Sequence, residues 1–345
     1  METLTNKTQR DISFDIMKFL AIFLVVYAHG LQHFIYHMNS FSEDVVWREI
    51  QSFHMPLFMT IAGYFAVQSM NMTPLNFVRK KAVTLLLPCV IWQIIAFPLS
   101  NSSSIIEFFN LCVVNFWFLK SVFVCYILAY LTFLLFRGLS FPNNSQLLMW
   151  GGGIFLIGTM FIPLFDLPRM YPCFLLGMMI KKSKLTESCY MPIILLLALI
   201  VFVVLSYIWC NDSNIWTSSI SLMNALLGNN SWYDFSYNYI MKLAIGFAGS
   251  MLIITALKLL LPKQHKKIFD MLAKVGSRTL GIYILQTYLL ERIMSRFISL
   301  EASVFNYVVG IPLISSAVIV ICYYMILVIE KNKYCALLLL GKLNR

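Results

Sequence analysis

Long runs of apolar residues are the feature of this sequence that most limits how the chain can fold. A helix that spans the hydrocarbon core of a bilayer needs about 20 predominantly apolar residues. Runs of this kind lie near residues 13–36, 50–70, 78–98, 115–136, 147–164, 190–209, 237–260 and 303–329. Two shorter runs, near 168–180 and 276–291, each follow a polar or Pro-containing break. The pattern predicts an all-α integral membrane protein of about ten transmembrane helices.

Composition argues against a soluble fold. Of the 345 residues, 60% are hydrophobic and 12% are charged, whereas an average soluble domain carries about 25% charged residues. The eight cysteines show no disulfide spacing, and Cys89, Cys125, Cys173 and Cys322 lie inside apolar runs, where cysteine behaves as a small hydrophobic residue. The excess of Lys and Arg over Asp and Glu does not indicate a nucleic-acid partner, because these residues fall in short clusters between the apolar runs.

The placement of these basic clusters predicts the orientation of the chain. If the N-terminus is cytoplasmic, 19 of the 26 Lys and Arg residues fall in cytoplasmic segments, and the outer loops hold four, Arg48, Arg169, Arg292 and Arg296. Cytoplasmic loops of membrane proteins carry such an excess of basic residues. We therefore expect one transmembrane domain over residues 1–345, with both termini cytoplasmic and with tails at 1–12 and 330–345. The outer loop near 210–236 is rich in aromatic and small polar residues, as an ordinary interfacial belt is.

The first predicted helix holds the densest set of ionisable residues. Asp15, Lys18, His29, His33 and His37 all lie in or beside it. Lys18 and His29 are eleven residues apart, which puts them on one helix face about 16 Å apart along the axis. Ionisable groups inside a span are costly, so each is a functional candidate. The structural alternative is that Lys18 reaches the inner surface beside Asp15 and that the histidines only cap the outer end.

The histidines of the first predicted helix and Lys120 of the fourth each allow a further interpretation. Histidines four residues apart can share a metal ion, but no acidic or Cys residue lies beside them at helical spacing, so we expect no metal. Lys120, in the fourth predicted helix, is either a functional cation or a residue that reaches the outer surface.

The first-helix pattern resembles the signature of the membrane acyltransferase-3 family, in its branch related to fucose and polysaccharide O-acetylases. That signature is a basic residue followed by ten residues and a His, with an Asp three positions before the basic residue, and it matches Asp15, Lys18 and His29. Later landmarks match in order and cover most of the chain. They are Phe53-His54-Met55-Pro56-Leu57-Phe58, Ala62-Gly63-Tyr64, the run from Phe77 through Lys81 to Pro88 and Trp92, Phe116-Trp117-Phe118-Leu119, Tyr171-Pro172-Cys173-Phe174-Leu175-Leu176-Gly177 and Ser277-Arg278-Thr279-Leu280-Gly281-Ile282-Tyr283.

Two positions depart from the family pattern. The third-helix entry of the family often has two arginines three residues apart, and here the pair is Lys81 and Thr84. The ninth helix of the family commonly has a His where this chain has Gln286. The first departure concerns donor binding, and the second concerns the acceptor or the surrounding polar network.

The resemblance implies transfer of an acyl group, most often acetyl from acetyl-CoA, to a sugar hydroxyl of a cell-envelope polysaccharide. It implies a multi-pass protein of the bacterial inner membrane that uses acyl-CoA from the cytoplasm, a glycan or lipid-linked sugar as acceptor, and no bound cofactor. His29 would be the general base or would carry the acyl group. Donor binding would fall to Asp15, Lys18, Arg79, Lys80 and Lys81. Supporting roles would fall to His33, His54, Trp117, Lys120 and Gln286.

Two other classes of protein remain open at this point. A lipid-linked glycan transporter or polymerase also has ten or more spans, but it has no need for a basic residue and a His at this interval. A membrane-bound acyltransferase of the other large fold family would be expected to carry its His much later in the chain.

Overall fold

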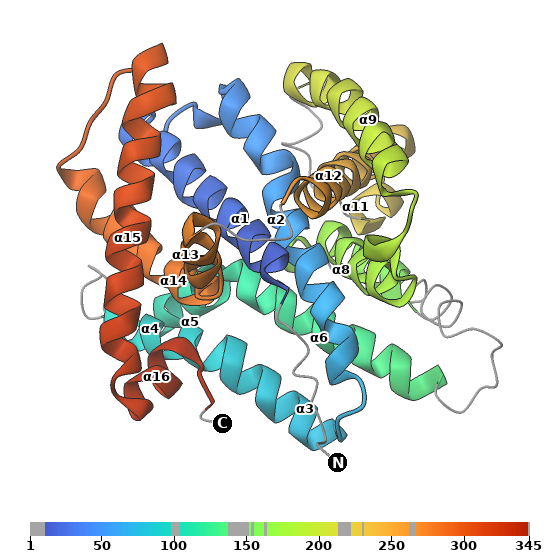
Figure 1. Cartoon of the computed structure of the whole chain (residues 1–345), viewed down its shortest axis with the longest axis horizontal. Coiled ribbons are helices and arrows are strands. Elements are labelled where there is room, and N and C mark those ends of the chain that lie inside the picture. The colour runs from blue at the N-terminus through green and yellow to red at the C-terminus, as the bar shows by residue number, and fades with distance from the viewer. Residues whose placement is uncertain are drawn as a thin grey trace.

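The computed structural model describes residues 11–97, 104–136, 152, 155–161, 164–212, 222–229, 231–261 and 267–343. The described part is built of helices and contains no strand, which confirms the predicted all-α class (Figure 1). Five of its helical segments are long and apolar enough to cross a membrane by length and composition. They are Ile12–Ile35, Trp117–Leu135, Met191–Asn211, Trp232–Leu260 and Asn306–Glu330.

The first half of the chain forms the elements that surround the site described below. The α-helices are α1 (Ile12–Gly30), α2 (Val45–Ala66), α3 (Pro74–Lys81), α4 (Leu87–Ala96), α5 (Ile105–Val114), α6 (Trp117–Phe136) and α8 (Leu167–Lys182). The π-helical segments are η1 (Leu31–Ile35) and η4 (Ala82–Leu86), and the 3-10 segments are η2 (Phe41–Glu43), η3 (Val67–Ser69) and η6 (Leu164–Asp166).

The second half begins with the 3-10 turn η7 (Leu185–Glu187). Its α-helices are α9 (Met191–Asn211), α11 (Leu222–Leu226), α12 (Trp232–Leu260), α13 (Lys267–Gly276), α14 (Thr279–Gln286), α15 (Ile311–Glu330) and α16 (Lys333–Leu340). The π-helical segments are η8 (Thr287–Ile293) and η10 (Asn306–Gly310), and η9 (Met294–Arg296) is a 3-10 turn.

Described helices overlie the predicted apolar runs, with one qualification. The run 147–164 falls mostly outside the described residues, although 155–161 within it are helical. Several runs are divided between α-helical and other helical segments. The first contains α1 and η1, the third contains α3, η4 and α4, the ninth contains α14 and η8, and the tenth contains η10 and α15. The number of about ten spanning helices and the cytoplasmic position of the termini stay predictions. The predicted C-terminal tail contains α16, which packs against α4 through a hydrogen bond from Trp92 Nε1 to the Leu339 carbonyl (2.9 Å).

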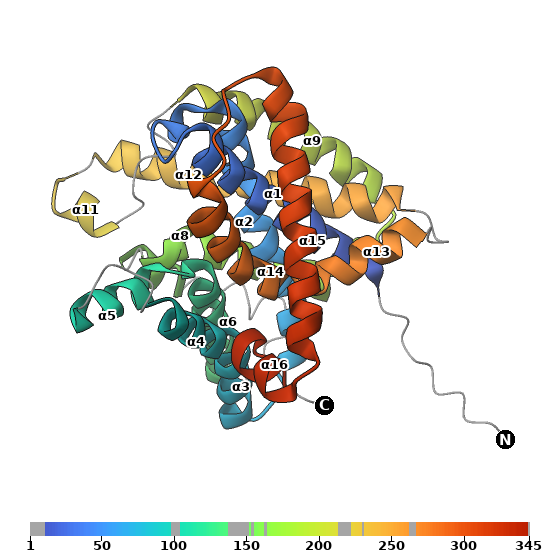
Figure 2. The ribbon, with the colours of Figure 1, turned by 90° about the vertical axis from the view of Figure 1, so that its left-hand side faces the viewer.

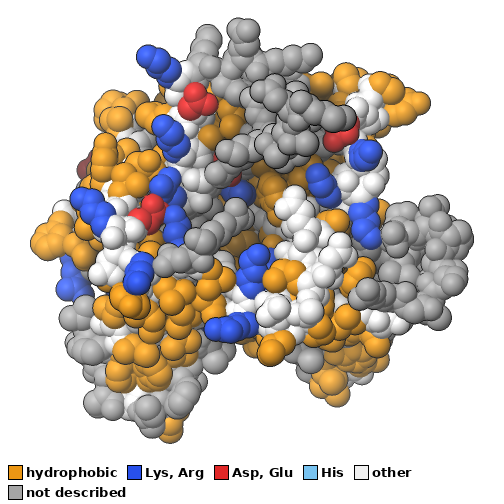
Figure 3. Space-filling view, turned by 60° about the horizontal axis from the view of Figure 1, so that its bottom comes forward, with side chains coloured by type: hydrophobic (Ala, Val, Ile, Leu, Met, Phe, Trp, Pro, Cys, Tyr) orange, Lys and Arg blue, Asp and Glu red, His pale blue; other side chains and the backbone are white. Residues whose placement is uncertain are grey.

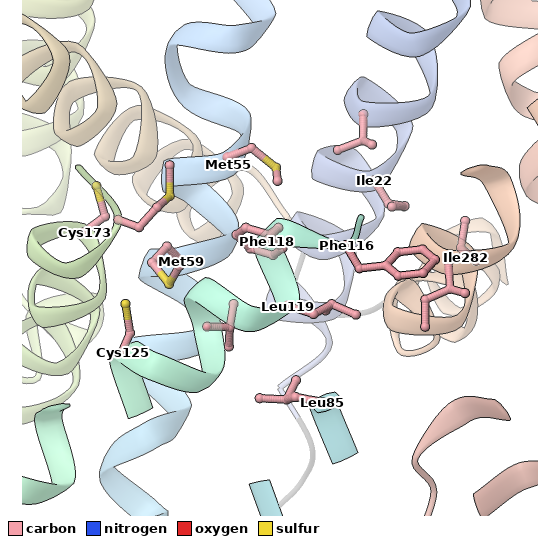
Figure 4. Packing of buried hydrophobic residues seen from close by; sticks show 14 of the residues in the cluster. Ile22, Met55, Met59, Leu85, Phe116, Phe118, Leu119, Cys125, Cys173 and Ile282 are labelled. Carbon is pink, nitrogen blue, oxygen red and sulfur yellow. The ribbon is translucent and has the colours of Figure 1, made fainter. Parts of the chain in front are cut away.

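The core of the molecule lies where α1, α2, α6, α8 and α14 meet. Figure 4 shows Ile22 of α1, Met55 and Met59 of α2, Phe118 of α6 and Cys173 of α8 turned toward this common centre. All eight cysteines are free, and the four placed in apolar runs by the sequence are buried, as expected. The burial of these side chains holds α1, with its ionisable residues, beside α2 and α14.

Close backbone contacts fix two of these crossings. A Cβ on Gly177 of α8 would lie 1.8 Å from the Thr60 carbonyl oxygen of α2, and one on Gly63 of α2 would lie 1.9 Å from the Phe174 carbonyl oxygen of α8. Small residues at helix interfaces allow such approach in membrane proteins. Gly276 of α13 likewise lies against the Asp15 carbonyl of α1.

Basic side chains are spread over the face on which α3 lies. Figure 3 views the molecule with the bottom of Figure 1 brought forward, and many Lys and Arg but few Asp or Glu side chains are visible there. Figure 2, turned by 90°, places α3 and α16 at the same end of the molecule. A basic face of this kind is consistent with the positive charge predicted for the cytoplasmic side.

Candidate functional site

The N-terminal half of α1 holds the predicted Asp15–Lys18 pair. The helix begins after Asp11, whose side chain accepts a hydrogen bond from the Ser13 backbone N–H (3.1 Å). Asp15 is buried, and its Oδ1 accepts from Lys18 Nζ at 3.2 Å. Lys18 Nζ also lies 4.9 Å from the centre of the Phe65 ring. Lys18 is therefore held by a buried carboxylate and an aromatic face, which a residue that only reaches the membrane surface does not need.

The C-terminal half of α1 brings His29 to an acidic residue far away in the sequence. Nδ1 of His29 lies 3.4 Å from Oε1 of Glu291, which comes from η8. This Nδ1 atom is buried and has no hydrogen bond among the described residues, while 31% of the side chain is exposed. The accessible part of the ring therefore lies away from Nδ1. A carboxylate beside Nδ1 favours the tautomer with its proton there, which leaves Nε2 as the basic nitrogen.

Both sides of this His–Glu contact are associated with π-helical segments. η1 directly follows His29 and contains His33, and η8 contains Glu291. Single π-turns inside α-helices occur frequently at functional sites. The additional residue in each turn shifts the side-chain register, so simple helical spacing does not give the side-chain directions here.

The side chain of Gln286 contacts the carboxylate of Glu291. Its Nε2 atom lies 3.4 Å from Glu291 Oε1 and 3.1 Å from Thr287 Oγ1. Gln286 is fully buried, and its Oε1 atom has no hydrogen bond among the described residues. The residue that replaces the family's His is thus a neighbour of the His29–Glu291 pair, as its expected supporting role requires.

Of the other two histidines in this region, His33 lies near Glu291 and His37 does not. His33 Nε2 lies 4.0 Å from Glu291 Oε2, and its ring stacks 6.2 Å from that of His29. His37 does not continue the stripe, because the helix has ended. Its backbone φ is 46°, it is exposed, and its Nε2 lies 2.9 Å from Ser299 Oγ. Ionisable side chains therefore follow this face of the first helix only as far as His33.

His29 and His33 have an acidic neighbour in three dimensions. The sequence offers none at helical spacing, and Glu291 supplies it from another element, η8. One potential ligand atom from each of His29, His33 and Glu291 lies within 4.8 Å of the other two. The expectation that no metal binds here stays a prediction, and the function proposed below needs none.

A cavity of about 270 Å³ lies between α1, α2, α6 and α14. Lys18 lines it, and the rest of its wall is mainly apolar and aromatic, with Tyr283 and Met55 among the lining residues. Tyr283 belongs to α14, the same helix that carries Gln286. The cavity is therefore lined by the basic residue of the signature, while His29 and Glu291 are not among its lining residues.

The other basic residues predicted for the donor site divide into two groups. Lys81 Nζ lies 3.5 Å from the centre of the Tyr126 ring, and Tyr126 lines the cavity. Arg79 and Lys80 are exposed on α3 and do not line it. One basic residue missed by the sequence analysis also lies nearby, since Lys181 Nζ is 3.4 Å from the Tyr64 hydroxyl and Tyr64 packs on Phe65 of the cavity wall.

The other three residues predicted to have supporting roles lie on α2 and α6. His54 is buried in α2, with Nδ1 2.6 Å from the Ile50 carbonyl oxygen. Trp117 lines a second cavity that shares Met55 with the first. Lys120 donates to the Asn115 carbonyl oxygen and lies 5.7 Å from the Phe165 ring centre. Lys120 is therefore held inside the protein and does not simply reach the surface.

Comparison with known proteins places this site in a family. A family model described as an acyltransferase domain, family 3, matches residues 11–327, a range that contains Lys18, His29 and Glu291. The chain belongs to this acyltransferase family.

The chain is also similar to two nodulation proteins over shorter ranges. The chain is 32% identical to the nodulation protein NolL of Sinorhizobium fredii over 188 residues, which is 50% of each chain. It is 32% identical to NolL of Mesorhizobium japonicum over 132 residues, 34% of this chain and 35% of that protein. The chain thus matches half or less of the length of these relatives. No solved structure matches it.

Besides Lys181, the sequence analysis missed two residues of the candidate site. Glu291 lies at the end of the ninth apolar run, where an acidic residue is unexpected, so its position alone could have marked it. Arg169 was counted only as an outer-loop charge, yet its side chain is inside, with Nη2 2.6 Å from the Gln51 carbonyl oxygen. The acyltransferase is a multi-pass membrane protein, and the pairing of His29 with Glu291 gives it an oriented imidazole suited to proton transfer.

Proposed function

We propose that this chain is a membrane O-acyltransferase that transfers acetyl from acetyl-CoA to a sugar hydroxyl of a bacterial cell-envelope polysaccharide. Capsule, O-antigen and exopolysaccharide are the acceptors of this class, and the inner membrane is the location. The observation that carries the proposal is the 3.4 Å approach of His29 Nδ1 to Glu291 in a chain of the acyltransferase family.

The proposed reaction uses His29 as a base that Glu291 orients. Nε2 of His29 takes the proton of the acceptor hydroxyl, and the sugar oxygen attacks the thioester carbonyl carbon. The new C–O bond forms, the C–S bond breaks, and the proton passes from the imidazolium to the departing thiolate. The products are the O-acetyl sugar and free coenzyme A. Glu291 stabilises the imidazolium that forms between these steps.

The inner cavity suits the acyl donor. Coenzyme A is polyanionic and cytoplasmic, and basic residues attract it to the inner face. Lys18 lines the cavity, and Lys81 and Lys181 lie on aromatic residues in or next to its wall. The mainly apolar lining would surround the uncharged arm and acyl group of the donor, with the phosphates left at the basic face. Arg79 and Lys80 would then attract the donor from the surface without lining the cavity.

The competing function is a lipid-linked glycan transporter or polymerase without acyl chemistry. It predicts a different phenotype when the gene is removed. Loss of an acyltransferase leaves the surface glycan in place but without its acyl group, whereas loss of a transporter or polymerase removes or shortens the glycan itself.

The test compares surface glycans by mass spectrometry in strains that carry the wild type, His29→Gln or no protein. His29→Gln keeps side-chain size and some hydrogen bonding, so membrane abundance should match the wild type. Glycan acylation should fall by at least the roughly 100-fold typical of losing a general base. His37→Gln, which changes an exposed residue beyond the helix, is the matched control and should stay near wild type. Normal acylation in His29→Gln would remove the catalytic role of this residue.

A further inference from the structure

A second cavity, of about 440 Å³, lies on the other side of Met55 from the one that contains Lys18. Its volume falls within the range of about 300–1,000 Å³ that is usual for small-molecule sites. α2, α6, η6 and α8 supply its wall, with Gln51, Trp117, Phe165, Asp166 and Arg169 among the lining residues. Gln51 lies in the first third of α2, and Arg169 lies in the first turn of α8, so on the predicted topology the cavity is in the outer half of the protein.

Arg169 is a positioned donor in the wall of this cavity. Its Nη2 lies 2.6 Å from the Gln51 carbonyl oxygen and 3.3 Å from that of Ser52, and its Nη1 lies 3.7 Å from Asp166 Oδ2. Its Nε is buried and has no hydrogen bond within the described part of the chain. A buried donor without a partner costs about 1–3 kcal/mol, so such groups usually meet a ligand or water.

Asp166 supplies the complementary acceptor. Its side chain is 35% exposed while it lines the cavity, so a ligand can reach the carboxylate. The backbone is left-handed at two consecutive non-glycine residues here, Phe165 and Asp166, whose φ values are 56° and 54°. Positive φ is unfavourable for a bulky residue, and such strain concentrates at functional positions. The Arg169 guanidinium donates hydrogen bonds and the Asp166 carboxylate beside it accepts them. The pair therefore matches a sugar hydroxyl, which can both donate and accept a hydrogen bond.

Aromatic residues complete the cavity. Trp117 and Phe165 line it from α6 and η6. The C–H groups on one face of a pyranose form an apolar surface that packs on an aromatic ring, whose face is electron-rich. Phe116, with a φ of 55°, turns the chain immediately before α6, so that Trp117 lines this cavity while Phe118 lines the inner one.

His54 lies in α2 directly before Met55, the residue that both cavities share. The two cavities share Met55, so a donor in one and an acceptor in the other would meet near the same stretch of α2. We propose that the cavity formed by Trp117, Phe165, Asp166 and Arg169 binds the pyranose ring that receives the acyl group. This assignment rests on the proposed function, because it gives the acceptor of that reaction its site.

The experiment uses the full chain in lipid nanodiscs, with acetyl-CoA and a panel of methyl pyranosides as defined acceptors. Transfer is followed by mass spectrometry, and pyranoside binding is followed separately by saturation-transfer NMR without donor. Trp117→Ala and Asp166→Asn should each raise the acceptor KM at least 10-fold and weaken the NMR signal, with the acetyl-CoA KM unchanged. Trp117→Phe should recover much of the affinity because it keeps an aromatic face. Trp232→Ala, which removes an exposed tryptophan outside the cavity, is the matched control.

The outcomes separate the two proposals. If the wild type transfers acetyl but Trp117→Ala and Asp166→Asn behave like Trp232→Ala, the acceptor site lies elsewhere while the function stands. If these variants raise the acetyl-CoA KM instead, the cavity holds the donor and the assignment is wrong. If the wild type binds pyranosides through Trp117 but does not transfer acetyl, the sugar site stands and the proposed function fails. A wild type that neither binds nor acetylates any pyranoside overturns the assignment.

Discussion

At the scale of single residues, the site depends on what surrounds His29. An imidazole inside an apolar span is unfavourable unless polar groups accompany it. Glu291 is 3.4 Å from its Nδ1, and Gln286 fixes Glu291 in turn. The proposed functional unit is therefore three side chains from α1, α14 and η8, of which only His29 belongs to the sequence signature.

Glu291 should act as a positioning residue for His29. Glu291→Gln keeps the volume of the side chain but removes the charge that stabilises a protonated imidazole. We expect kcat for acetyl transfer to fall about 100-fold, with the acetyl-CoA KM unchanged and with partial recovery in Glu291→Asp. Glu301→Gln changes an exposed acidic residue and serves as the control. Steady-state kinetics in nanodiscs provide the measurement, and an unchanged kcat in Glu291→Gln would show that the contact is only structural.

Lys18 should act on the donor instead. Lys18→Ala removes the cation that lines the inner cavity, so the acetyl-CoA KM should rise about 10-fold or more, as loss of one charge-assisted contact worth about 1.5–3 kcal/mol implies. Lys18→Arg should retain much of the affinity because the charge survives. Lys274→Ala, at an exposed position of α13, should have no effect. Normal coenzyme A binding by Lys18→Ala, measured by titration calorimetry, would make this residue an anchor and not a ligand.

At the scale of helices, the crossing of α2 with α8 holds the two cavities in place. Gly177→Val should destabilise the protein by more than the about 1–3 kcal/mol of ordinary overpacking, because the new side chain would meet the α2 backbone at Thr60. Gly158→Val adds the same side chain where nothing lies within 4 Å of the Cβ, and should be tolerated. Denaturation midpoints of the two variants in detergent test this directly. Equal midpoints would mean that the crossing can relax at little cost.

The same scale shows what the sequence could and could not predict. The apolar runs predicted where helices lie, because twenty apolar residues have few other stable arrangements. His29 and His33 lie side by side, as their i+4 spacing predicts. His37 does not continue the row, because η1 and the end of the helix change the register. No local pattern relates His29 to Glu291, since that contact depends on how α1 packs against the segment after α14. Likewise, Arg79, Lys80 and Lys81 form one basic run in sequence, yet only Lys81 contacts the cavity wall.

At the scale of the whole molecule, the proposed function assigns the two cavities to opposite sides of the membrane. The inner one contains Lys18 and is near basic residues, and the outer one contains Trp117, Asp166 and Arg169. They share Met55, and the His29–Glu291 pair lies at the outer end of α1. Such an arrangement lets a cytoplasmic donor and an external acceptor react without either crossing the bilayer. It requires the predicted orientation, with α1 running from the cytoplasm outward.

The orientation can be tested by cysteine labelling in intact cells. The segments near residues 40, 105 and 225 should be outside, and the loops near 71–81, 181–189 and 258–275 should be cytoplasmic. The predicted cytoplasmic loop 137–146 lies outside the described residues. Cys189 is free and exposed on a predicted cytoplasmic loop, so it serves as an internal reporter. Asn39→Cys, Ser104→Cys and Asn229→Cys place exposed thiols at the predicted outer positions.

With the other cysteines replaced by serine, a membrane-impermeant maleimide should label each outer thiol in intact cells, because the positive-inside distribution of Lys and Arg places these segments outside. It should reach Cys189 only after the membrane is opened. Each variant keeps Lys18 and His29, so transfer activity can confirm that the labelled protein is folded. If any of the three outer positions is labelled only from the cytoplasm, the map of about ten helices is wrong. The outer cavity would then lose the access to external glycans that an acceptor site requires.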